Sequence, residues 1–364
     1  TKFLRLIKEF DENTSTEAQF ANAVEKLDAM VQCIYDKDLW YELGVNEEIL
    51  KKKKLPQIVK DIRAYKPDEI NYAYQKNVSY SQFSMFRTCP KRWSLQYKDG
   101  FKMFTSSIHT VFGTALHEVL QYYLDVMYEE SAAEADRKNL VEMFENALRD
   151  EYKVQYKKNN NQHFSTSTEL REFFEDGVEI IRTFAKKRGQ HFSKRGWHLV
   201  GCEVPVILPP NKFNNNVIYQ GYLDVVMYHE PTNTFKIIDI KTSTRGWNDM
   251  AKKDESKQFQ LILYKKFFSE QFNVPLDNIN IEFFIVKRKV MSHPDYTIPR
   301  IQTFSPPSGK IKLGKATTAL NNFLEEAFDK GGHRDKIHRA NASKWNCTFC
   351  PFLNTEHCSE GISK

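Results

Sequence analysis

The sequence of 364 residues has no apolar run long enough to cross a membrane. A membrane helix needs about 20 consecutive apolar residues, and the first residues also lack the basic segment and apolar core of a secretion signal. We therefore expect a chain that is not secreted, lies in the cytoplasm or on the nucleoid, and has no membrane partner. Because the chain opens on Thr1 within a helix-like pattern rather than on Met, we expect the natural protein to extend further upstream.

A phosphate-binding loop of the ATPase type is also absent. The motif Gly-x-x-x-x-Gly-Lys-Ser/Thr does not occur, since neither Gly309-Lys310 nor Gly314-Lys315 completes it. The chain therefore has no ATP-driven motor of its own, and any step that needs one would be performed by a separate partner.

Charge of one sign is only slightly in excess. Lysines and arginines number 53 against 47 acidic residues, which gives a net charge of +6. The cations cluster at 51–54, 186–188 and 287–289. A solvated face accounts for most runs of this kind, and a polyanionic partner is the alternative that a basic balance allows.

Cysteine is scarce and unevenly placed, with six residues in the chain. Without a secretion signal we expect a reducing compartment, where clustered cysteines more often hold metal than form disulfides. Cys347, Cys350 and Cys358 offer three sulfurs, and Cys89 is the best candidate for the fourth. Zinc and an iron–sulfur cluster both accept four thiolates, so the pattern leaves both open. The other two lie in apolar patterns and are expected to be buried thiols: Cys33 and Cys202.

The order of the elements predicts an α/β protein with a mixed central sheet flanked by helices. Helical patterns come first and strand patterns follow, and the last strands alternate with helices. Helices are expected within 1–62 and over about 80–97, 112–128, 137–156, 168–188, 255–271 and 310–329, and strands over 197–208, 217–228, 235–242, 280–287 and 296–303. A break at 66–68 and a cysteine-containing tail from 345 complete the organisation, which divides the chain into a helical segment over 1–76 and a domain over 77–364.

Two apolar strand patterns end on aspartates, and a lysine follows the second. Asp224 and Asp239 lie at corresponding points of neighbouring strands, so we expect both carboxylates at one edge of the sheet. Two adjacent carboxylates repel one another unless a cation lies between them, and Mg²⁺ favours such oxygens. Because side chains alternate along a strand, Asp239 and Lys241 face the same way. A lysine beside a metal can orient or deprotonate a water, which suits phosphodiester hydrolysis. A surface ion pair is the simpler reading of Asp-x-Lys alone.

Other residues strengthen the first reading. His117 is expected on a helix beside its apolar face, although a lone helical histidine is usually a satisfied core or surface residue. Gly221, three residues before Asp224, would allow the close approach of another backbone or a phosphate. Gln260 and Tyr264 lie one helical turn apart, a spacing that core packing also explains.

Taken together, these motifs resemble a known family. Gly-x-x-x-His, Gly-x-x-Asp, Asp-x-Lys and Gln-x-x-x-Tyr occur in this order and are similar to the RecB/AddB branch of the PD-(D/E)XK nucleases, over about residues 78–360. The resemblance implies a restriction-endonuclease-like core in which Mg²⁺ or Mn²⁺ is bound by His117, Asp224, Asp239 and the carbonyl of Ile240. It also implies that Lys241 is the catalytic lysine. Gln260 and Tyr264 would support the site or contact the DNA backbone.

The cysteines fit the same resemblance. One cysteine before the nuclease core and three after it are similar to the iron–sulfur version of this fold, found in AddB and in CRISPR-associated relatives. There a [4Fe–4S] cluster joins the two ends of the domain, and zinc is the less favoured occupant. The expected ligands are Cys89, Cys347, Cys350 and Cys358. A cluster of this kind would stabilise the fold by closing a long loop.

The expected substrate is DNA, with single-stranded ends favoured. The stretch 79–93 interleaves aromatic and basic side chains, a mixture that suits single strands because bases stack and phosphates pair with cations. The expected contacts are Tyr80, Arg87, Lys91 and Arg92, and the same stretch contains Phe83 and Trp93. Tyr80 and Phe83 fit a core position equally well. The reading is an exonuclease of DNA repair, recombination or defence, working with a separate helicase or a recombination or CRISPR partner.

Two alternatives and one further resemblance remain. The fold could serve as a clamp on DNA ends without turnover, or as a zinc-stapled nucleotide hydrolase. Residues 9–35, within the segment 1–40, resemble the last helices of HD-domain phosphohydrolases, with Glu25 at the place of a metal-binding aspartate. The upstream His…His-Asp residues are absent, so no HD activity is expected, and a plain helical appendage is the alternative.

Overall fold

The structure is a computed structural model that describes residues 55–66, 76–101, 103–104, 106–209, 217–290 and 298–362. Most of the predicted N-terminal helices, the HD-like resemblance, Cys33 and the basic run 51–54 therefore lie outside the described residues. The description below concerns the compact unit Gln57–Lys364. None of the described helices combines the length and apolarity required to cross a membrane.

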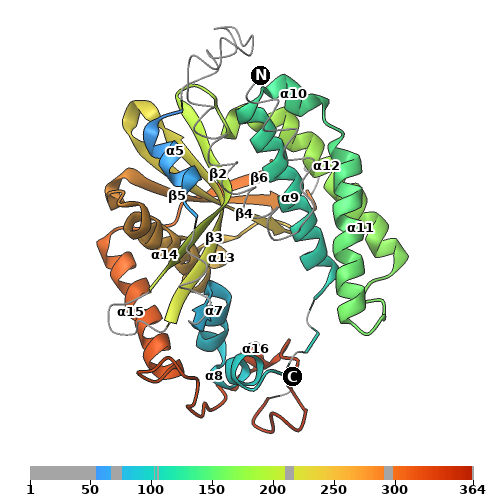
Figure 1. The fold of residues 1–364 in the computed structure, drawn as a ribbon. Helices are drawn as coiled ribbons and strands as arrows, with labels where there is room; N and C mark the ends of the chain where they lie inside the picture. Colours follow the sequence, from blue (N-terminus) through green and yellow to red (C-terminus); the bar gives the residue numbers. More distant parts are fainter. Residues whose placement is uncertain are drawn as a thin grey trace, which may run out of the picture. The chain divides into compact units, whose positions relative to one another are not determined.

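The described unit is built from helices around one sheet (Figure 1). The helices are α5 (Gln57–Ala64), α7 (Tyr80–Thr88), α8 (Pro90–Trp93), α9 (Ile108–Glu129), α10 (Ala132–Arg137), α11 (Leu140–Lys158), α12 (Ser167–His191), α13 (Asp249–Lys253), α14 (Glu255–Phe272), α15 (Lys310–Ala327) and α16 (Lys344–Cys347). The strands are β1 (Lys76–Val78), β2 (Trp197–Leu208), β3 (Val217–His229), β4 (Thr234–Ser243), β5 (Ile279–Lys287) and β6 (Ile301–Phe304).

The six strands form a mixed sheet, as the sequence predicted. The strand order is β1-β3-β4-β5-β6, and β2 pairs with β3. β3 pairs antiparallel with β2 and β4, β4 pairs parallel with β5, and β1 pairs parallel with β3. The parallel pair β4–β5 is joined by a crossover through α14, which is the connection that parallel neighbours require.

Helices cover both faces of the sheet. α9 packs against β2, β3 and β4 on one side together with α11 and α12, while α14 packs against β2, β4 and β5 and carries α15 outside it. Apolar strand residues at alternate positions supply the core beneath α9, among them Val225, Met227, Ile238 and Ile240. Asp239, which lies between Ile238 and Ile240, points to the other face of β4.

Most boundaries agree with the periodicity, but the strand expected over 296–303 is found at Ile301–Phe304, and neither α10 nor β1 was predicted. The helix expected over 80–97 is divided, because Cys89 is extended (φ −156°, ψ 106°) and Pro90 starts a new helix. A residue before proline is disfavoured in the helical region, which explains the break. The capping box predicted at Thr166 and Glu169 is present at the start of α12.

The start of the compact unit differs from the predicted division at 76/77. α5 buries Val59 and Ile62 and packs against β2. Arg63 of this helix donates hydrogen bonds to the carbonyls of Leu199 and Val200. The segment 57–64 therefore belongs to the same compact unit as the sheet.

Candidate active site

The two aspartates lie where β3 and β4 separate. β3 and β4 pair from Val225↔Ile238 to His229↔Thr234, so Asp224 and Asp239 follow the last pair and face one another across the widening gap. Farther along the same edge of β3, β1 takes over the pairing at Val217–Tyr219. The carboxylates thus lie in a fork inside the sheet. The strands do not end at the aspartates as the apolar pattern suggested, because β3 (Val217–His229) and β4 (Thr234–Ser243) both continue beyond them.

Asp239 is a buried carboxylate with incomplete compensation. It is 1% exposed, and its Oδ2 lies 2.8 Å from Lys241 Nζ. Its Oδ1 has no hydrogen-bond donor among the described residues. Asp239 and Lys241 share a face of β4, as the alternation of side chains predicts. An ionised oxygen that is buried without a donor is costly, and such a group calls for an absent partner.

Asp224 is oriented by the backbone of the neighbouring strand. The Ile240 N–H donates to Asp224 Oδ2 at 2.7 Å, and His117 Nδ1 lies 3.5 Å from the same oxygen. The backbone of Ile240 is also within hydrogen-bonding reach of His117. α9 therefore brings its histidine into the fork, and four predicted ligands gather there: His117, Asp224, Asp239 and Ile240.

The pKa values in the fork reflect burial and shared charge. Burial raises the pKa of Asp224 to about 6 and that of Asp239 to about 6, although Lys241 opposes both shifts. Burial would lower the pKa of Lys241, but the two aspartates outweigh it and raise that pKa. Burial, followed by the charge of Lys241, lowers the pKa of His117. The lysine is therefore an ammonium and the histidine a neutral imidazole with a free lone pair.

This donor set fits a hard divalent cation. Two carboxylates, a neutral imidazole and a carbonyl are ligands that Mg²⁺ and Mn²⁺ accept, and the unpartnered Asp239 Oδ1 marks where positive charge is missing. Within the described part of the chain, the ligand atoms of His117, Asp224 and Asp239 do not all lie within 4.8 Å of one another. The two carboxylates repel one another, and each has one oxygen held by another group: Asp239 by Lys241 and Asp224 by the Ile240 N–H. The ligand atoms therefore stay apart.

Two glycines permit the close packing of the fork. A Cβ at Gly113 would lie 3.3 Å from Thr242 Oγ1, so the absence of a side chain lets α9 approach β4 next to Lys241. A Cβ at Gly221 would lie 2.8 Å from Tyr264 Cε1. The space that the sequence reserved for a backbone or a phosphate is therefore filled by the tyrosine ring.

Gln260 and Tyr264 lie beside the fork on α14. Gln260 Nε2 lies 3.4 Å from the Tyr264 hydroxyl, and Tyr264 is buried. Burial raises the pKa of Tyr264, and Asp239, Asp224 and Glu203 add to the shift. The hydroxyl therefore remains protonated and close enough to the carboxylates to sense their charge.

Sequence reasoning missed two polar residues of this site. Gln121 on α9 is buried, and its Nε2 donates to Glu203 Oε1 at 2.6 Å and to the Asp224 carbonyl at 2.9 Å. Glu203 on β2 lies opposite Asp224, between the pairs Cys202↔Val225 and Val204↔Leu223. The spacing His117…Gln121 was the available signal, since residues four apart share a helix face.

Two of the three cations in the basic run 287–289, Arg288 and Lys289, form ion pairs. Arg288 Nη1 lies 2.9 Å from Glu172 and 2.6 Å from Asp176, both on α12. Lys289 Nζ contacts the same carboxylates at 2.8 and 2.9 Å. We call these four side chains the α12 clamp. Because Arg288 and Lys289 are paired with carboxylates, they do not form a free basic face.

The residues predicted to contact nucleic acid have unequal surroundings. Arg87 is exposed and stacks on the Phe259 ring at 4.9 Å, and the Tyr80 hydroxyl donates to the Ser256 carbonyl at the start of α14. Lys91 is paired with Glu360 at 3.3 Å. Arg92 is half-buried, and its Nε is enclosed without a hydrogen-bond partner among the described residues. The interleaved aromatics are core residues, with Phe83 and Trp93 fully buried.

The cysteine tail packs against the segment that carries Cys89. Asn341 Nδ2 donates to the Thr88 carbonyl at 3.2 Å, and Lys98 Nζ donates to the Lys336 carbonyl at 3.1 Å. Leu95 forms a small core with Phe352 and Cys358, against which Cys350 packs. Figure 1 shows α8, α16 and the C-terminus together. The two ends of the unit thus meet where the sequence predicted a staple.

No zinc-sized set of sulfurs is formed there. Four thiolates at about 2.3 Å from one zinc lie about 3.8 Å apart, and within the described residues no three cysteine sulfurs lie within 4.8 Å of one another. Cys89, Cys350 and Cys202 are half-buried, while Cys347 and Cys358 are buried. Cys202 lies outside the tail, with its Sγ 3.8 Å from the Gln121 carbonyl.

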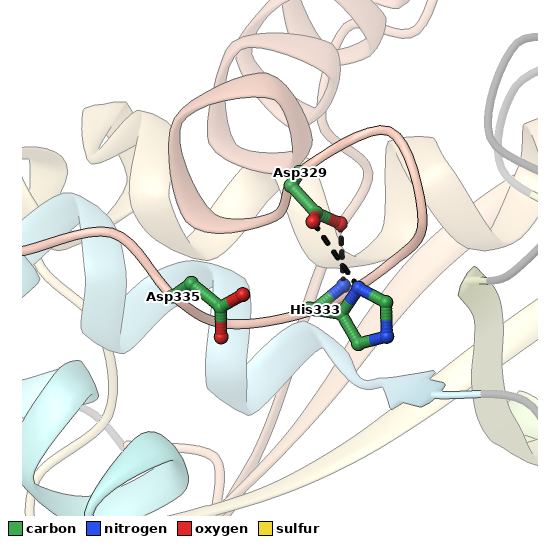
Figure 2. A group of neighbouring side chains, drawn as sticks. All are labelled: Asp329, His333 and Asp335. Atoms are coloured by element: carbon green, nitrogen blue, oxygen red, sulfur yellow. Dashed lines mark hydrogen bonds and ion pairs between the residues drawn. The ribbon is translucent and has the colours of Figure 1, made fainter.

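A separate group of candidate ligands lies after α15. Asp329, His333 and Asp335 have ligand atoms within 4.8 Å of one another, which holds for no other such group in the described ranges (Figure 2). Asp329 Oδ1 accepts the N–H of Gly331 and of His333 at 2.8 Å, and Oδ2 lies 3.1 Å from His333 Nδ1. These bonds close an exposed loop, which accounts for the cluster.

Comparison with known proteins identifies the family. No match is found among the curated proteins. Among solved structures, a crystal structure from Eubacterium rectale named "Putative exonuclease" shares 13% identity, with 71% of this chain and 83% of that chain covered and a TM-score of 0.40. A family model described as the PD-(D/E)XK nuclease superfamily matches residues 77–355. Nucleases of this superfamily generally use divalent metals such as Mg²⁺ or Mn²⁺. The chain belongs to the PD-(D/E)XK nuclease superfamily.

Proposed function

We propose that this nuclease hydrolyses phosphodiester bonds of DNA from single-stranded ends with Mg²⁺ or Mn²⁺ in the fork, and that it is of the RecB/AddB type. The observation that carries the proposal is the buried, unpartnered Asp239 Oδ1 beside Lys241, with Asp224 and His117 on the same gap. Buried charge without compensation is unfavourable for folding alone, so a cation and a substrate are its natural complement.

Each residue of the fork has a part that follows from its environment. A bound divalent cation supplies Lewis acidity toward the phosphate and lowers the pKa of water. Asp224 and Asp239 supply the negative charge that retains it, and the Ile240 N–H fixes the orientation of Asp224. His117 is held neutral by burial, so it offers a lone pair rather than a repelling proton.

Lys241 acts by charge and by donation. The two aspartates keep it protonated, so its ammonium donates hydrogen bonds and offsets the negative charge that develops on the phosphate. Electrostatic stabilisation of this kind is worth about 10²–10³ in rate for a single donor. Orientation of the attacking water is consistent with this position, whereas deprotonation of the water by Lys241 is not favoured while it retains its proton.

A single-stranded end is supported by the rim of the site. Arg87 on α7 is exposed, and the half-buried Tyr80 on the same helix bonds through its hydroxyl to the start of α14, the helix that carries Gln260 and Tyr264. An exposed guanidinium at this place suits a phosphate of a single strand. Because Lys91 is engaged by Glu360, Arg87 is the stronger of the proposed phosphate contacts. A separate helicase or recombination partner would supply single strands, since the sequence contains no motor motif.

The second part of the proposal is a [4Fe–4S] cluster on Cys89, Cys347, Cys350 and Cys358. The packing of the tail on 88–98 supports it, and a cubane holds its thiolates farther apart than a single zinc does. Iron and sulfide analysis with visible absorbance after anaerobic purification tests this part. A colourless, zinc-loaded protein would contradict it.

The experiment that tests the activity follows single-stranded DNA labelled at either end, with Mg²⁺ or Mn²⁺ and with chelator. The parent should shorten the DNA only with metal, and Lys241→Ala should abolish the shortening while the protein remains folded. The label gives the polarity. DNA that is bound but left intact by the folded parent would support a clamp on DNA ends and contradict the nuclease activity.

A further inference from the structure

Glu203 has a backbone conformation that a strand does not require. Its φ is +51°, in the left-handed region, although it lies within β2. A residue with a Cβ is disfavoured there, and such strain persists where the surroundings enforce it, commonly at functional sites. Glu203 lies opposite Asp224 in the pairing of β2 with β3.

A buried glutamine links this strained residue to the fork. Gln121 uses the two protons of its side-chain amide on Glu203 Oε1 and on the Asp224 carbonyl, at 2.6 and 2.9 Å. It lies one turn after His117 on α9, so one helix face orients both residues. The Glu203 side chain is exposed to solvent, although its carboxylate accepts a hydrogen bond from the buried Gln121.

The charge of Glu203 reaches the proposed metal ligands. It raises the pKa of Asp224, after the larger effect of burial, and it also opposes the lowering of the pKa of His117. A third carboxylate next to two buried ones is unfavourable in the metal-free protein. The same charge becomes favourable once a divalent cation lies between them.

We propose that Glu203, held by Gln121, is a metal-positioning residue that strengthens binding of the divalent cation in the fork. The inference rests on the proposed metal site and adds to it a carboxylate that the motifs did not contain. Mg²⁺ and Mn²⁺ retain water when bound to proteins, and a carboxylate that accepts from such water contributes without direct ligation. Loss of an outer partner of this kind typically weakens metal affinity by about 10–100-fold.

The test is a Mn²⁺ titration at neutral pH, with free Mn²⁺ followed by electron paramagnetic resonance. Glu203→Gln keeps an acceptor oxygen for Gln121 and removes only the charge, so its affinity should fall about tenfold or more with an unchanged unfolding midpoint. Glu203→Asp should restore part of the affinity. Glu282→Gln is the matched control, because Glu282 is a partly buried carboxylate of the same sheet that pairs with Lys236 outside the fork.

A second variant separates positioning from a merely structural role. Asparagine tolerates positive φ better than glutamate does, so Glu203→Asn should unfold at the same temperature as the parent or higher while its Mn²⁺ affinity falls as in Glu203→Gln. Unchanged affinity in both variants, with binding lost in Asp239→Asn, would overturn the inference and leave the proposed function intact. A parent that binds no Mn²⁺ would overturn both.

Discussion

Two groups of ionised side chains lie at the same end of β4 and are compensated differently. In the α12 clamp, Glu172 and Asp176 each contact both Arg288 and Lys289. In the fork, the buried Asp239 and the partly buried Asp224 have one cation between them, Lys241, which contacts only Asp239. The clamp is electrically complete, whereas the fork has an excess of negative charge inside the sheet.

The difference indicates which group serves folding and which serves chemistry. Paired charges at a surface contribute modestly to stability, and burying an unbalanced carboxylate costs stability. The clamp also positions the fork, because Arg288 N–H and Lys289 N–H donate to the carbonyls of Ser243 and Thr244, just after Lys241. The uncompensated carboxylates therefore belong to the proposed reactive site, and the fully paired charges of the clamp belong to the structure that supports it.

The largest expected effect comes from exchanging one carboxylate of each group for an amide. Asp239→Asn should reduce metal-dependent cleavage by about 10²–10³-fold or more, because the cation loses a ligand and Lys241 loses its partner. Asp176→Asn should leave cleavage per folded molecule within about twofold. Steady-state rates normalised to folded protein measure both. Equal losses in the two variants would mean that the groups do not differ in role.

The geometry of the fork can be disturbed without touching a charge. Gly221→Ala places a Cβ 2.8 Å from Tyr264 Cε1, so the tyrosine ring must move. A shift of about 1 Å can cost about 10²-fold in rate, and we expect a loss of about 10-fold or more with metal affinity retained. Gly189→Ala is the control, since a Cβ at Gly189 meets no atom within 4 Å. An unchanged rate in Gly221→Ala would show that Tyr264 is not needed where it lies.

Substitutions in the clamp should lower the free energy of unfolding rather than the rate of cleavage. Arg288→Ala leaves Asp176 without its closest cation and removes the stacking of the guanidinium on Phe173 at 4.1 Å. We expect about 2 kcal/mol of destabilisation in urea, less than a fully buried pair would cost. Lys91→Ala, which breaks the more exposed pair with Glu360, should leave the urea midpoint almost unchanged. A larger effect at Lys91 would reverse this ranking.

The smallest expected effect is a pH dependence of the metal-free protein. The folded pKa values of Asp224 and Asp239, about 6, exceed the ordinary value of 3.8. Between about pH 4 and pH 6 the folded state therefore holds protons that the unfolded state has released, so the contribution of this pair to stability falls as pH rises. Metal affinity should change oppositely and increase as pH rises through about 6.

Urea unfolding with chelator at pH 5 and pH 7, compared between the parent and the Asp224→Asn, Asp239→Asn double variant, measures that contribution. The difference between the two proteins should shift in favour of the parent at pH 5. If the difference instead favours the parent at pH 7, the ionised carboxylates are stabilised by their surroundings. The fork would then be compensated as fully as the clamp.

Local pattern predicted the elements well, because period and capping are local properties. The strand over 197–208 was predicted with its observed ends, and the capping box at Thr166 marked the start of α12. β1 escaped prediction, since three residues carry too little alternation to be recognised. Its pairing with β3 is nevertheless what closes the far side of the fork.

The sequence by itself indicated the PD-(D/E)XK superfamily and the order of the elements, and it singled out Asp224, Asp239, Lys241 and His117 as candidate site residues, because short motifs and local periodicity are visible without a structure. Only the tertiary structure showed that β3 and β4 diverge and that Arg288 and Lys289 form ion pairs with α12. It also showed that Gln121 joins Glu203 to the site. These facts depend on contacts between residues far apart in the chain. A periodic pattern indicates which way a side chain points, but not which residues of other elements it contacts.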